Sequence, residues 1–196
     1  MNIAITGAGG FIGSKLTAKF LKDGNSVSGI DRYFFGEHII SNFLDNPNFK
    51  AVKNDIRFLK PTDFNTIDTV IDLAGLSNDP SCDIDHQITR SINYNGTLNV
   101  AKAAKDGGVK QYIFASSCSV YGFTGNSIST EASPLNPVSY YAKLKAAAEQ
   151  EVLKLADQNF CVTVFRIATL YGLSHRMRFD LAVNLMTLTA WKKRRI

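Results

Sequence analysis

The sequence predicts an α/β protein with a doubly wound parallel sheet, and three observations carry that prediction. Short apolar runs alternate with helical patterns along the whole chain. The runs are nearly continuous rather than alternating with polar residues, as expected for strands covered on both faces. Parallel strands need crossover connections, and right-handed crossovers place helices on both sides of the sheet. The 196 residues are enough for one such core and the start of a second lobe.

The expected elements follow one another in this order. Strands are predicted at 3–6, 27–30, 51–53, 70–74, 112–115 and 162–167. Helices are predicted at Phe11–Lys22, 84–105 and 140–156, and the first of these carries Ile12, Leu16 and Phe20 on one face. Glycines and prolines gather in 122–137, which we interpret as a structured loop rather than a domain boundary.

The composition narrows the class of protein. Hydrophobic residues make up 45% and charged residues 20%, as in soluble globular proteins. No apolar run reaches the roughly 18 residues of a membrane span, and MNIAIT resembles a strand rather than a basic leader. Cys82, Cys118 and Cys161 are scattered without CxxC spacing, as are the histidines. We therefore expect a cytoplasmic protein with reduced thiols, no membrane partner and no metal site.

The formal net charge of +5 is concentrated at the end of the chain. Lys192, Lys193, Arg194 and Arg195 supply most of it. Because basic residues are favoured at helix C-termini by the helix dipole, we interpret WKKRRI as the solvated end of a helix. A tail that binds nucleic acid is the less favoured alternative, so no nucleic-acid partner is expected.

The stretch TGAGGFIGS, residues 6–14, follows a predicted strand and opens a predicted helix. In this context Gly7 permits a tight turn, Gly10 lets a pyrophosphate approach the backbone, and Gly13 lets the helix pack against the strand. The N–H groups at the helix start, including those of Phe11 and Ile12, would face the phosphates. A glycine-rich turn without a ligand is the alternative. No Lys-Ser/Thr pair follows, which excludes a P-loop, so the stretch predicts a Rossmann-like dinucleotide site.

Asp31 ends the second predicted strand and indicates which dinucleotide binds. A carboxylate there can accept hydrogen bonds from the adenosine ribose and would repel a 2′-phosphate, which favours NAD over NADP. Arg32 follows directly, and an arginine could instead accept a phosphate or stack on adenine. We expect NAD, with Asp31 and Arg32 at its adenosine end.

Together with five later motifs, the GxxGxxG spacing resembles the extended short-chain dehydrogenase/reductase family, the NAD-dependent epimerases and dehydratases of nucleotide sugars. The motifs are NDI at 54–56, LAGLS at 73–77, NYNGTLNV at 93–100, SSCSVYG at 116–122 and YAKLK at 141–145. The resemblance implies that Asp55 and Ile56 lie against the adenine, and that Leu73, Ala74 and Gly75 line the ribose and the pyrophosphate. Asn93 corresponds to the asparagine that the family carries on this helix. It also implies a homodimer that pairs the helices of Asn93 and Tyr141.

Tyr141 and Lys145 lie one helical turn apart and so share a face. A tyrosine of ordinary pKa, about 10, is a poor base at neutral pH, and a nearby ammonium and a cationic nicotinamide are expected to lower that pKa. Tyr141 could then remove a hydroxyl proton while a hydride leaves the same carbon for NAD⁺. Ser117 is expected to bind the reacting oxygen, and the resemblance implies that Tyr141 and Lys145 also contact the cofactor. Tyr140 is not favoured, because one turn onward from it lies Leu144.

The two residues after Ser117 indicate the type of reaction. In 4,6-dehydratases of the family an acidic pair stands there, whereas this chain has Cys118 and Ser119. The resemblance is therefore closest to UDP-sugar 4-epimerases, with a nucleotide-sugar oxidoreductase or decarboxylase as alternatives. We expect Cys118 to be a small buried residue rather than a catalytic thiol.

Residues 165–186 resemble the family's crossing into a substrate-binding lobe. We therefore predict an NAD-binding domain at 1–172 and the beginning of an incomplete substrate lobe at 173–196. Asn184 would contact the substrate's diphosphate, and Arg176 and Arg178 could either pair with an anionic substrate or form a solvated turn.

Family members are considerably longer than this chain. We expect the cofactor site to be complete and the sugar site incomplete, so that the chain binds NAD but turns over poorly on its own. Apolar side chains of the last segment would then be exposed, namely Leu181, Val183, Leu185, Leu188 and Trp191. The competing hypothesis is a non-catalytic dinucleotide sensor on the same fold. The presence of Ser117, Tyr141 and Lys145 argues against it, because a sensor needs no base.

Overall fold

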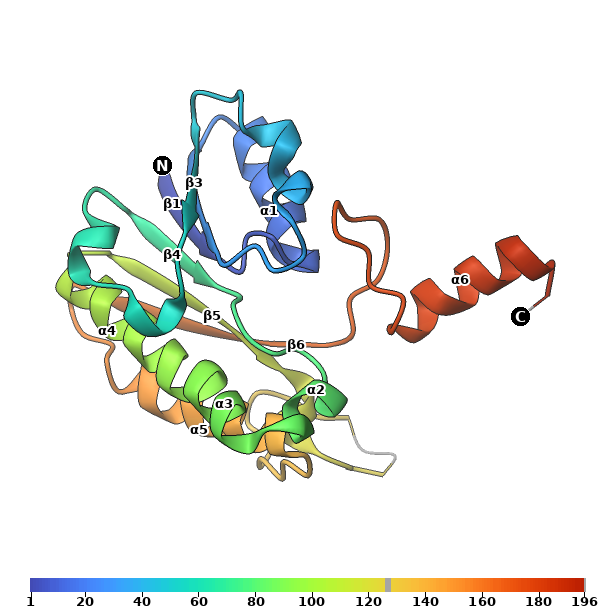
Figure 1. The fold of residues 1–196 in the computed structure, drawn as a ribbon. Helices are drawn as coiled ribbons and strands as arrows, with labels where there is room; N and C mark the ends of the chain where they lie inside the picture. The colour runs from blue at the N-terminus through green and yellow to red at the C-terminus, as the bar shows by residue number, and fades with distance from the viewer. Residues whose placement is uncertain (126–127, 196) are drawn as a thin grey trace.

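The computed structural model describes residues 1–125 and 128–195, in which six strands form one parallel sheet (Figure 1). The strands are β1 (Asn2–Thr6), β2 (Ser26–Asp31), β3 (Phe49–Lys53), β4 (Thr69–Asp72), β5 (Gln111–Ser117) and β6 (Cys161–Ile167). Their order is β3-β2-β1-β4-β5-β6. The order reverses between β1 and β4, where Ile3 lies opposite both Val27 of β2 and Thr69 of β4. The predicted doubly wound parallel sheet is confirmed.

Helices cover both faces of the sheet. The helices are α1 (Phe11–Lys22), α2 (Asp79–Ile84), α3 (His86–Arg90), α4 (Thr97–Asp106), α5 (Tyr140–Leu153) and α6 (Ala182–Lys193). Shorter helical turns are η1 (Glu37–Phe43), η2 (Ile56–Phe58), η3 (Pro61–Phe64), the π-helical η4 (Ser91–Gly96) and η5 (Cys118–Tyr121). Figure 1 shows α1 on one side of the sheet and α3, α4 and α5 on the other.

Alternate residues of β1 point into two different cores, as a two-faced sheet requires. Ile3 and Ile5 pack in one cluster with Leu21 of α1. Ala4 packs in the other with Val100 of α4 and Val152 of α5. The continuous apolar strands noted in the sequence are therefore explained by burial on both sides.

Strand β4 is shorter than the predicted 70–74. It ends at Asp72, because the backbone N–H groups of Leu73 and Ala74 turn toward Thr6, each 3.2 Å from its Oγ1. The loop after β4 therefore bends over the end of β1 rather than continuing the sheet.

The predicted helix 84–105 is observed from His86 to Asp106, while the short helix α2 before it was not predicted. Asp85 has an extended backbone (φ −148°) between α2 and α3, and its Oδ1 accepts the N–H groups of Gln87 and Ile88 at 2.8 and 2.9 Å. The acid acts as an N-cap, so α3 begins at His86 and runs through η4 into α4. The third predicted helix, 140–156, ends earlier, at Leu153, and residues 126–127 of the expected loop lie outside the described residues.

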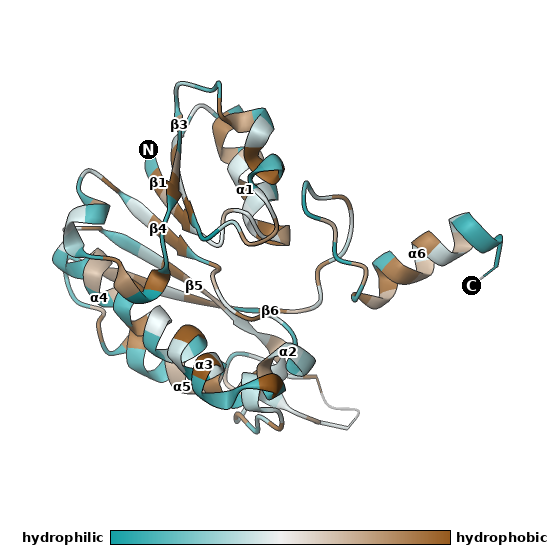
Figure 2. Cartoon of the chain, viewed as in Figure 1, coloured by the Kyte–Doolittle hydropathy of each residue, from teal (hydrophilic) through white to brown (hydrophobic). Residues whose placement is uncertain are grey.

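Helix α6 extends away from the sheet (Figure 1). Val183, Leu185 and Trp191 are exposed by 41%, 48% and 71%, while Leu181 and Leu188 are half-buried. Figure 2 shows the apolar colour along this helix and a hydrophilic end, where residues 192–195 are exposed. The expected apolar exposure and the solvated basic end are both present.

The part of the chain that the structure describes contains neither a helix suited to cross a membrane nor a cluster of metal-binding side chains. No helix in 1–125 or 128–195 combines the length and the apolar character that a membrane crossing requires. Within the same ranges, no three His, Cys, Asp or Glu side chains gather as a metal site would require.

Candidate functional site

The glycine loop joins β1 to α1 at the point where the strand order reverses. Gly7 has a φ of +71°, which favours glycine, and its N–H donates to the Ile30 carbonyl at 2.8 Å. A Cβ at Gly13 would lie 2.1 Å from the Gly7 carbonyl oxygen. Helix α1 therefore sits against the loop at a distance that a larger residue would prevent, as predicted for Gly13.

The start of α1 is suited to an anion. Among the described residues no side chain caps Gly10, the N-cap, and the first turn contains no acid. The first helical N–H groups, which belong to Phe11, Ile12 and Gly13, have no acceptor within the helix. Together with the positive end of the helix dipole they could hold a phosphate, so this loop fits a dinucleotide.

Asp31 lies beside the loop at the end of β2, with its carboxylate fixed by two backbone groups. Its Oδ2 accepts the Gly9 N–H at 2.9 Å and its Oδ1 accepts the Tyr33 N–H at 2.7 Å. Tyr33 is buried and donates its hydroxyl to the Gly29 carbonyl at 2.8 Å. Gly9 and Tyr33 were missed by the sequence analysis, since nothing local marks them as partners of the acid.

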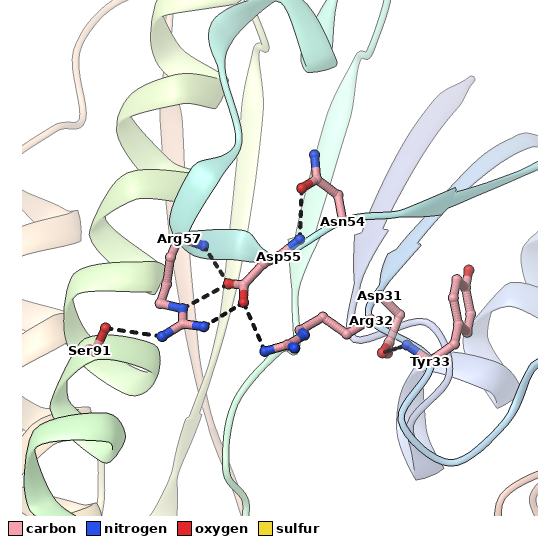
Figure 3. A network of polar contacts seen from close by, with 7 residues as sticks. All are labelled: Asp31, Arg32, Tyr33, Asn54, Asp55, Arg57 and Ser91. Carbon is pink, nitrogen blue, oxygen red and sulfur yellow. Dashed lines mark hydrogen bonds and ion pairs between the residues drawn. The ribbon is translucent and has the colours of Figure 1, made fainter.

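Asp55 follows β3 and is surrounded by arginine (Figure 3). Arg57 donates from Nε to Oδ1 at 3.0 Å and from Nη2 to Oδ2 at 2.7 Å, while Arg32 Nη1 reaches Oδ2 at 3.2 Å. The hydrogen bond from Arg57 is the main reason that the pKa of Asp55 is lowered. Ile56 is buried directly after it. Arg32 thus lies beside Asp55, while the expected contacts of both residues and of Ile56 with the adenosine stay predictions. Arg57 was not foreseen.

Asn93, in η4, holds the loop after β4. It is fully buried, and its amide accepts from the Leu76 N–H at 2.8 Å and donates to the Leu76 carbonyl at 2.9 Å. A Cβ at Gly75 would lie 2.9 Å from Asn93 Oδ1. The asparagine therefore fixes the loop at Leu76, directly after Gly75, and π-helical turns of this kind are often found at functional sites.

Ser117, Tyr141 and Lys145 are brought together at the carboxyl end of β5. Tyr141 lies in the first turn of α5, one turn before Lys145. Lys145 is only 5% exposed; its Nζ donates to the Ala115 carbonyl at 2.9 Å and lies 5.9 Å from the Tyr141 ring centroid. Ser117 Oγ accepts the hydroxyl of Ser119 at 2.9 Å, which leaves its own hydrogen for another acceptor.

The pKa values of Tyr141 and Lys145 differ from the expectation. Burial raises the pKa of Tyr141 above the ordinary tyrosine value, and a hydrogen bond with Ser117 opposes that rise only in part. Burial also lowers the pKa of Lys145 to about 8. The prediction that the lysine lowers the tyrosine pKa is therefore wrong for the protein alone, because desolvation disfavours both charged forms.

Replacing Lys145 by methionine is expected to remove a pH-dependent cost to folding of about 3 kcal/mol at pH 7, because the variant buries no ammonium. Burial lowers the folded-state pKa to about 8, whereas an unfolded lysine titrates near pH 10.4. Between these values the unfolded state binds more protons, so the stability of the unchanged protein rises with pH. Urea unfolding from pH 7 to about pH 10 should show the stability difference shrinking. A stability difference that stays the same from pH 7 to about pH 10 would contradict the assignment.

The two cysteines near this group differ in their exposure to solvent. Cys118 is exposed, not buried as predicted, because it starts the helical turn η5 at the edge of the sheet. Cys82 is buried instead and lies 3.7 Å from Asn93 Nδ2. Burial raises the pKa of the Cys82 thiol to about 11, so it is protonated at neutral pH.

The segment 173–180 lies against the glycine loop and the loop after β4. Ser174 donates its hydroxyl to the Phe11 carbonyl at 2.6 Å, and Arg178 donates to Ser77 Oγ at 3.1 Å and pairs with Asp180. Arg176 lies 3.5 Å from the ring centroid of Phe35. The two arginines are therefore held by the protein itself, and their pairing with a substrate stays a prediction.

Asn184 is buried in the first turn of α6. Its Oδ1 accepts the Gly172 N–H and its Nδ2 donates to the Arg178 carbonyl, both at 2.9 Å. The amide thus fixes the ends of the preceding segment, while the predicted contact to a diphosphate stays a prediction.

A buried ion pair supports the helix that carries Tyr141. Arg166 of β6 donates from Nη2 and Nε to Glu149 Oε2 at 2.9 and 3.1 Å, and Ser116 donates to the same carboxylate. Arg166 also donates to the Tyr121 hydroxyl at 3.0 Å. The network ties α5 to β5 and β6. The sequence analysis missed it, because its members are far apart in the chain.

Comparison with known proteins agrees with this geometry. The model of the NAD dependent epimerase/dehydratase family matches residues 3–191. A UDP-glucose 4-epimerase of Mycolicibacterium smegmatis is 33% identical over 160 residues, covering 76% of this chain and 49% of that protein. A UDP-glucuronic acid decarboxylase 1 of Danio rerio is 29% identical over 195 residues, 96% of this chain and 46% of that protein. The chain thus spans about half the length of these curated relatives.

A solved structure resembles the fold over nearly the whole chain. The UDP-glucuronic acid 4-epimerase of Bacillus cereus, in complex with NAD, superposes with a TM-score of 0.84 at 27% identity. The match covers 98% of this chain and 63% of that one.

Proposed function

Because this chain belongs to the NAD-dependent epimerase/dehydratase family, we propose that it binds NAD and serves the oxidation and re-reduction of a hydroxyl-bearing carbon of a nucleotide sugar, as a 4-epimerase does. The observation that carries the proposal is the meeting of Ser117, Tyr141 and Lys145 at the carboxyl edge of the sheet. That edge also carries the glycine loop, and ligands of open α/β sheets bind outside it.

The residues present fit the cofactor. The uncapped start of α1 would hold the pyrophosphate, and Asp31 would accept hydrogen bonds from the adenosine ribose. The loop 73–75, held by Thr6 at Leu73 and Ala74 and by Asn93 at Leu76, would line the path between them. When bound, NAD⁺ accepts a hydride from the carbon that is oxidised.

The chain's own residues would handle the proton. Tyr141 would remove it from the sugar hydroxyl, and Ser117, whose oxygen is oriented by Ser119, would donate a hydrogen bond to the reacting oxygen. Lys145 would bind the nicotinamide ribose and favour the phenolate in the complex. Cys118 and Ser119 supply no carboxylate, so 4,6-dehydration is not proposed.

A decarboxylase or oxidoreductase is the second candidate, and the match to a UDP-glucuronic acid decarboxylase 1 favours it. We further propose a nucleotide-sugar partner, a cytoplasmic location, and a homodimer through the helices that carry Asn93 and Tyr141, all on the family resemblance. Residues 173–196 would begin the substrate-binding lobe.

Isothermal titration of the purified chain with NAD⁺, NADH and UDP-, GDP- and dTDP-sugars tests the proposal. We expect NAD⁺ and NADH to bind, and one sugar nucleotide to generate NADH absorbance slowly in the NAD⁺ complex. Cofactor binding without any binding or oxidation of a sugar nucleotide would favour the non-catalytic sensor. Failure to bind either dinucleotide would contradict both hypotheses.

A further inference from the structure

We propose that Asp55 strengthens the preference for NAD that Asp31 gives this chain, by holding Arg32 away from the 2′-phosphate that distinguishes NADP from NAD. The inference rests on the proposed function, since it concerns the adenosine end of the same site. It differs from the contact that the family resemblance implies, in which Asp55 lies against the adenine.

The acceptor positions of Asp55 are already occupied (Figure 3). Its Oδ1 accepts the Arg57 backbone N–H and Arg57 Nε, both at 3.0 Å. Its Oδ2 accepts Arg57 Nη2 at 2.7 Å and Arg32 Nη1 at 3.2 Å. An ionised carboxylate offers about four lone-pair positions. All four are thus used inside the protein, and the side chain serves to position arginines.

Arg32 is held more loosely than Arg57. It makes a single contact with the carboxylate, and its guanidinium carbon lies 4.2 Å from the ring centroid of Phe34. The side chain of Arg32 is 46% exposed and Phe34 is 73% exposed. One hydrogen bond and one exposed ring therefore hold the guanidinium, and it can move once the carboxylate charge is removed.

Movement of Arg32 would affect cofactor binding, because this residue directly follows Asp31 in the chain. Asp31 is fixed by the N–H groups of Gly9 and Tyr33, in the position where an acid meets the adenosine ribose. The next residue is therefore within reach of a group on the ribose 2′-oxygen, and arginine is well suited to phosphate. In the arrangement observed, Arg32 is turned to Asp55 instead.

The other cations nearby are also paired. Arg32, Lys53 and Arg57 all line a surface depression of about 350 Å³. Lys53 pairs with Glu37 at 2.8 Å, and Arg57 has its two contacts with Asp55. Each cation has a carboxylate partner, so the depression does not present a free cation to a phosphate.

Replacing Asp55 by asparagine tests the proposal, because it keeps the shape and removes the charge. The measurement is the ratio of the dissociation constants of NADP⁺ and NAD⁺ by isothermal titration, which cancels any lost adenine contact. The unchanged chain should prefer NAD⁺. In D55N the ratio should move toward NADP⁺ by about tenfold, the size of one charge-assisted hydrogen bond. An unchanged ratio would overturn the inference.

Three further variants separate the mechanism from a general effect of charge. In D55N/R32Q the gain should disappear; if it persists, Arg32 is not the cause and the inference fails. Glu37→Gln removes the carboxylate that pairs with Lys53 without releasing Arg32, and an equal gain there would also overturn it. Phe34→Leu, at an exposed position, loosens Arg32 with Asp55 intact and should shift the ratio in the same direction by a smaller factor.

The outcomes also distinguish this inference from the proposed function. If the chain binds NAD⁺ but the ratio of the NADP⁺ and NAD⁺ dissociation constants does not respond to Asp55→Asn or Phe34→Leu, only the inference is contradicted. Absence of dinucleotide binding by the unchanged chain contradicts the proposed function and the inference together.

Discussion

Replacing Gly13 by alanine is expected to weaken NAD⁺ binding at least about 100-fold and to destabilise the fold by about 3 kcal/mol. The added Cβ would lie 2.1 Å from the Gly7 carbonyl oxygen and 2.8 Å from the Ala8 Cα. Both atoms belong to the backbone, so the clash cannot be relieved by turning a side chain. Either α1 or the loop must move, and both would hold the pyrophosphate.

The free energy of unfolding from urea titration and the NAD⁺ affinity from calorimetry measure the two effects. Lys15→Ala is the matched control, because Lys15 is exposed on the same helix and its replacement should change neither quantity appreciably. Unaltered NAD⁺ affinity in a folded G13A variant would show that the glycine loop is not the phosphate site.

Replacing Tyr141 by phenylalanine is expected to slow hydride transfer from a sugar nucleotide by about 10²- to 10⁴-fold. The variant loses only the hydroxyl, which is proposed to remove the substrate proton. Because the ring remains, NAD⁺ affinity should change little. Single-turnover formation of NADH in the complex of the chain with NAD⁺ and the sugar nucleotide measures the rate directly.

Tyr140→Phe is the control for that measurement. Tyr140 is the neighbouring residue of α5, but its hydroxyl donates to the His86 carbonyl at 3.2 Å and its ring stacks on His86. Hydride transfer should therefore remain close to that of the unchanged chain. Equal losses in Y140F and Y141F would show that the effect is structural and would remove Tyr141 from the proposed role.

Local signals in the sequence were sufficient for much of the fold. Helix α1 has the predicted bounds, because the glycine stretch, the apolar face and the following Asp23–Gly24 turn all act within a few residues. The start of the next long helix was predicted two residues early, although Asp85 is a good N-cap for α3. The short helix α2 was not predicted at all.

The parts of the site that depend on distant contacts could not be predicted. The elevated pKa of Tyr141 comes from burial by the assembled fold, while the sequence spacing indicated only its lysine neighbour. The Glu149–Arg166 pair is likewise visible only once α5 and β6 are in place. Arg57, by contrast, is two residues from Asp55 and was overlooked although the contact is local. Cys118 was misjudged, since the exposure of a residue after a strand depends on how the following loop leaves the sheet.

A crystal structure of this chain with bound NAD⁺ tests most directly whether the glycine loop and Tyr141 form one site. We predict that the pyrophosphate accepts hydrogen bonds from the N–H groups at the start of α1 and that the Tyr141 hydroxyl faces the nicotinamide. A dinucleotide bound elsewhere, or a Tyr141 hydroxyl directed away from the nicotinamide, would contradict the proposed function.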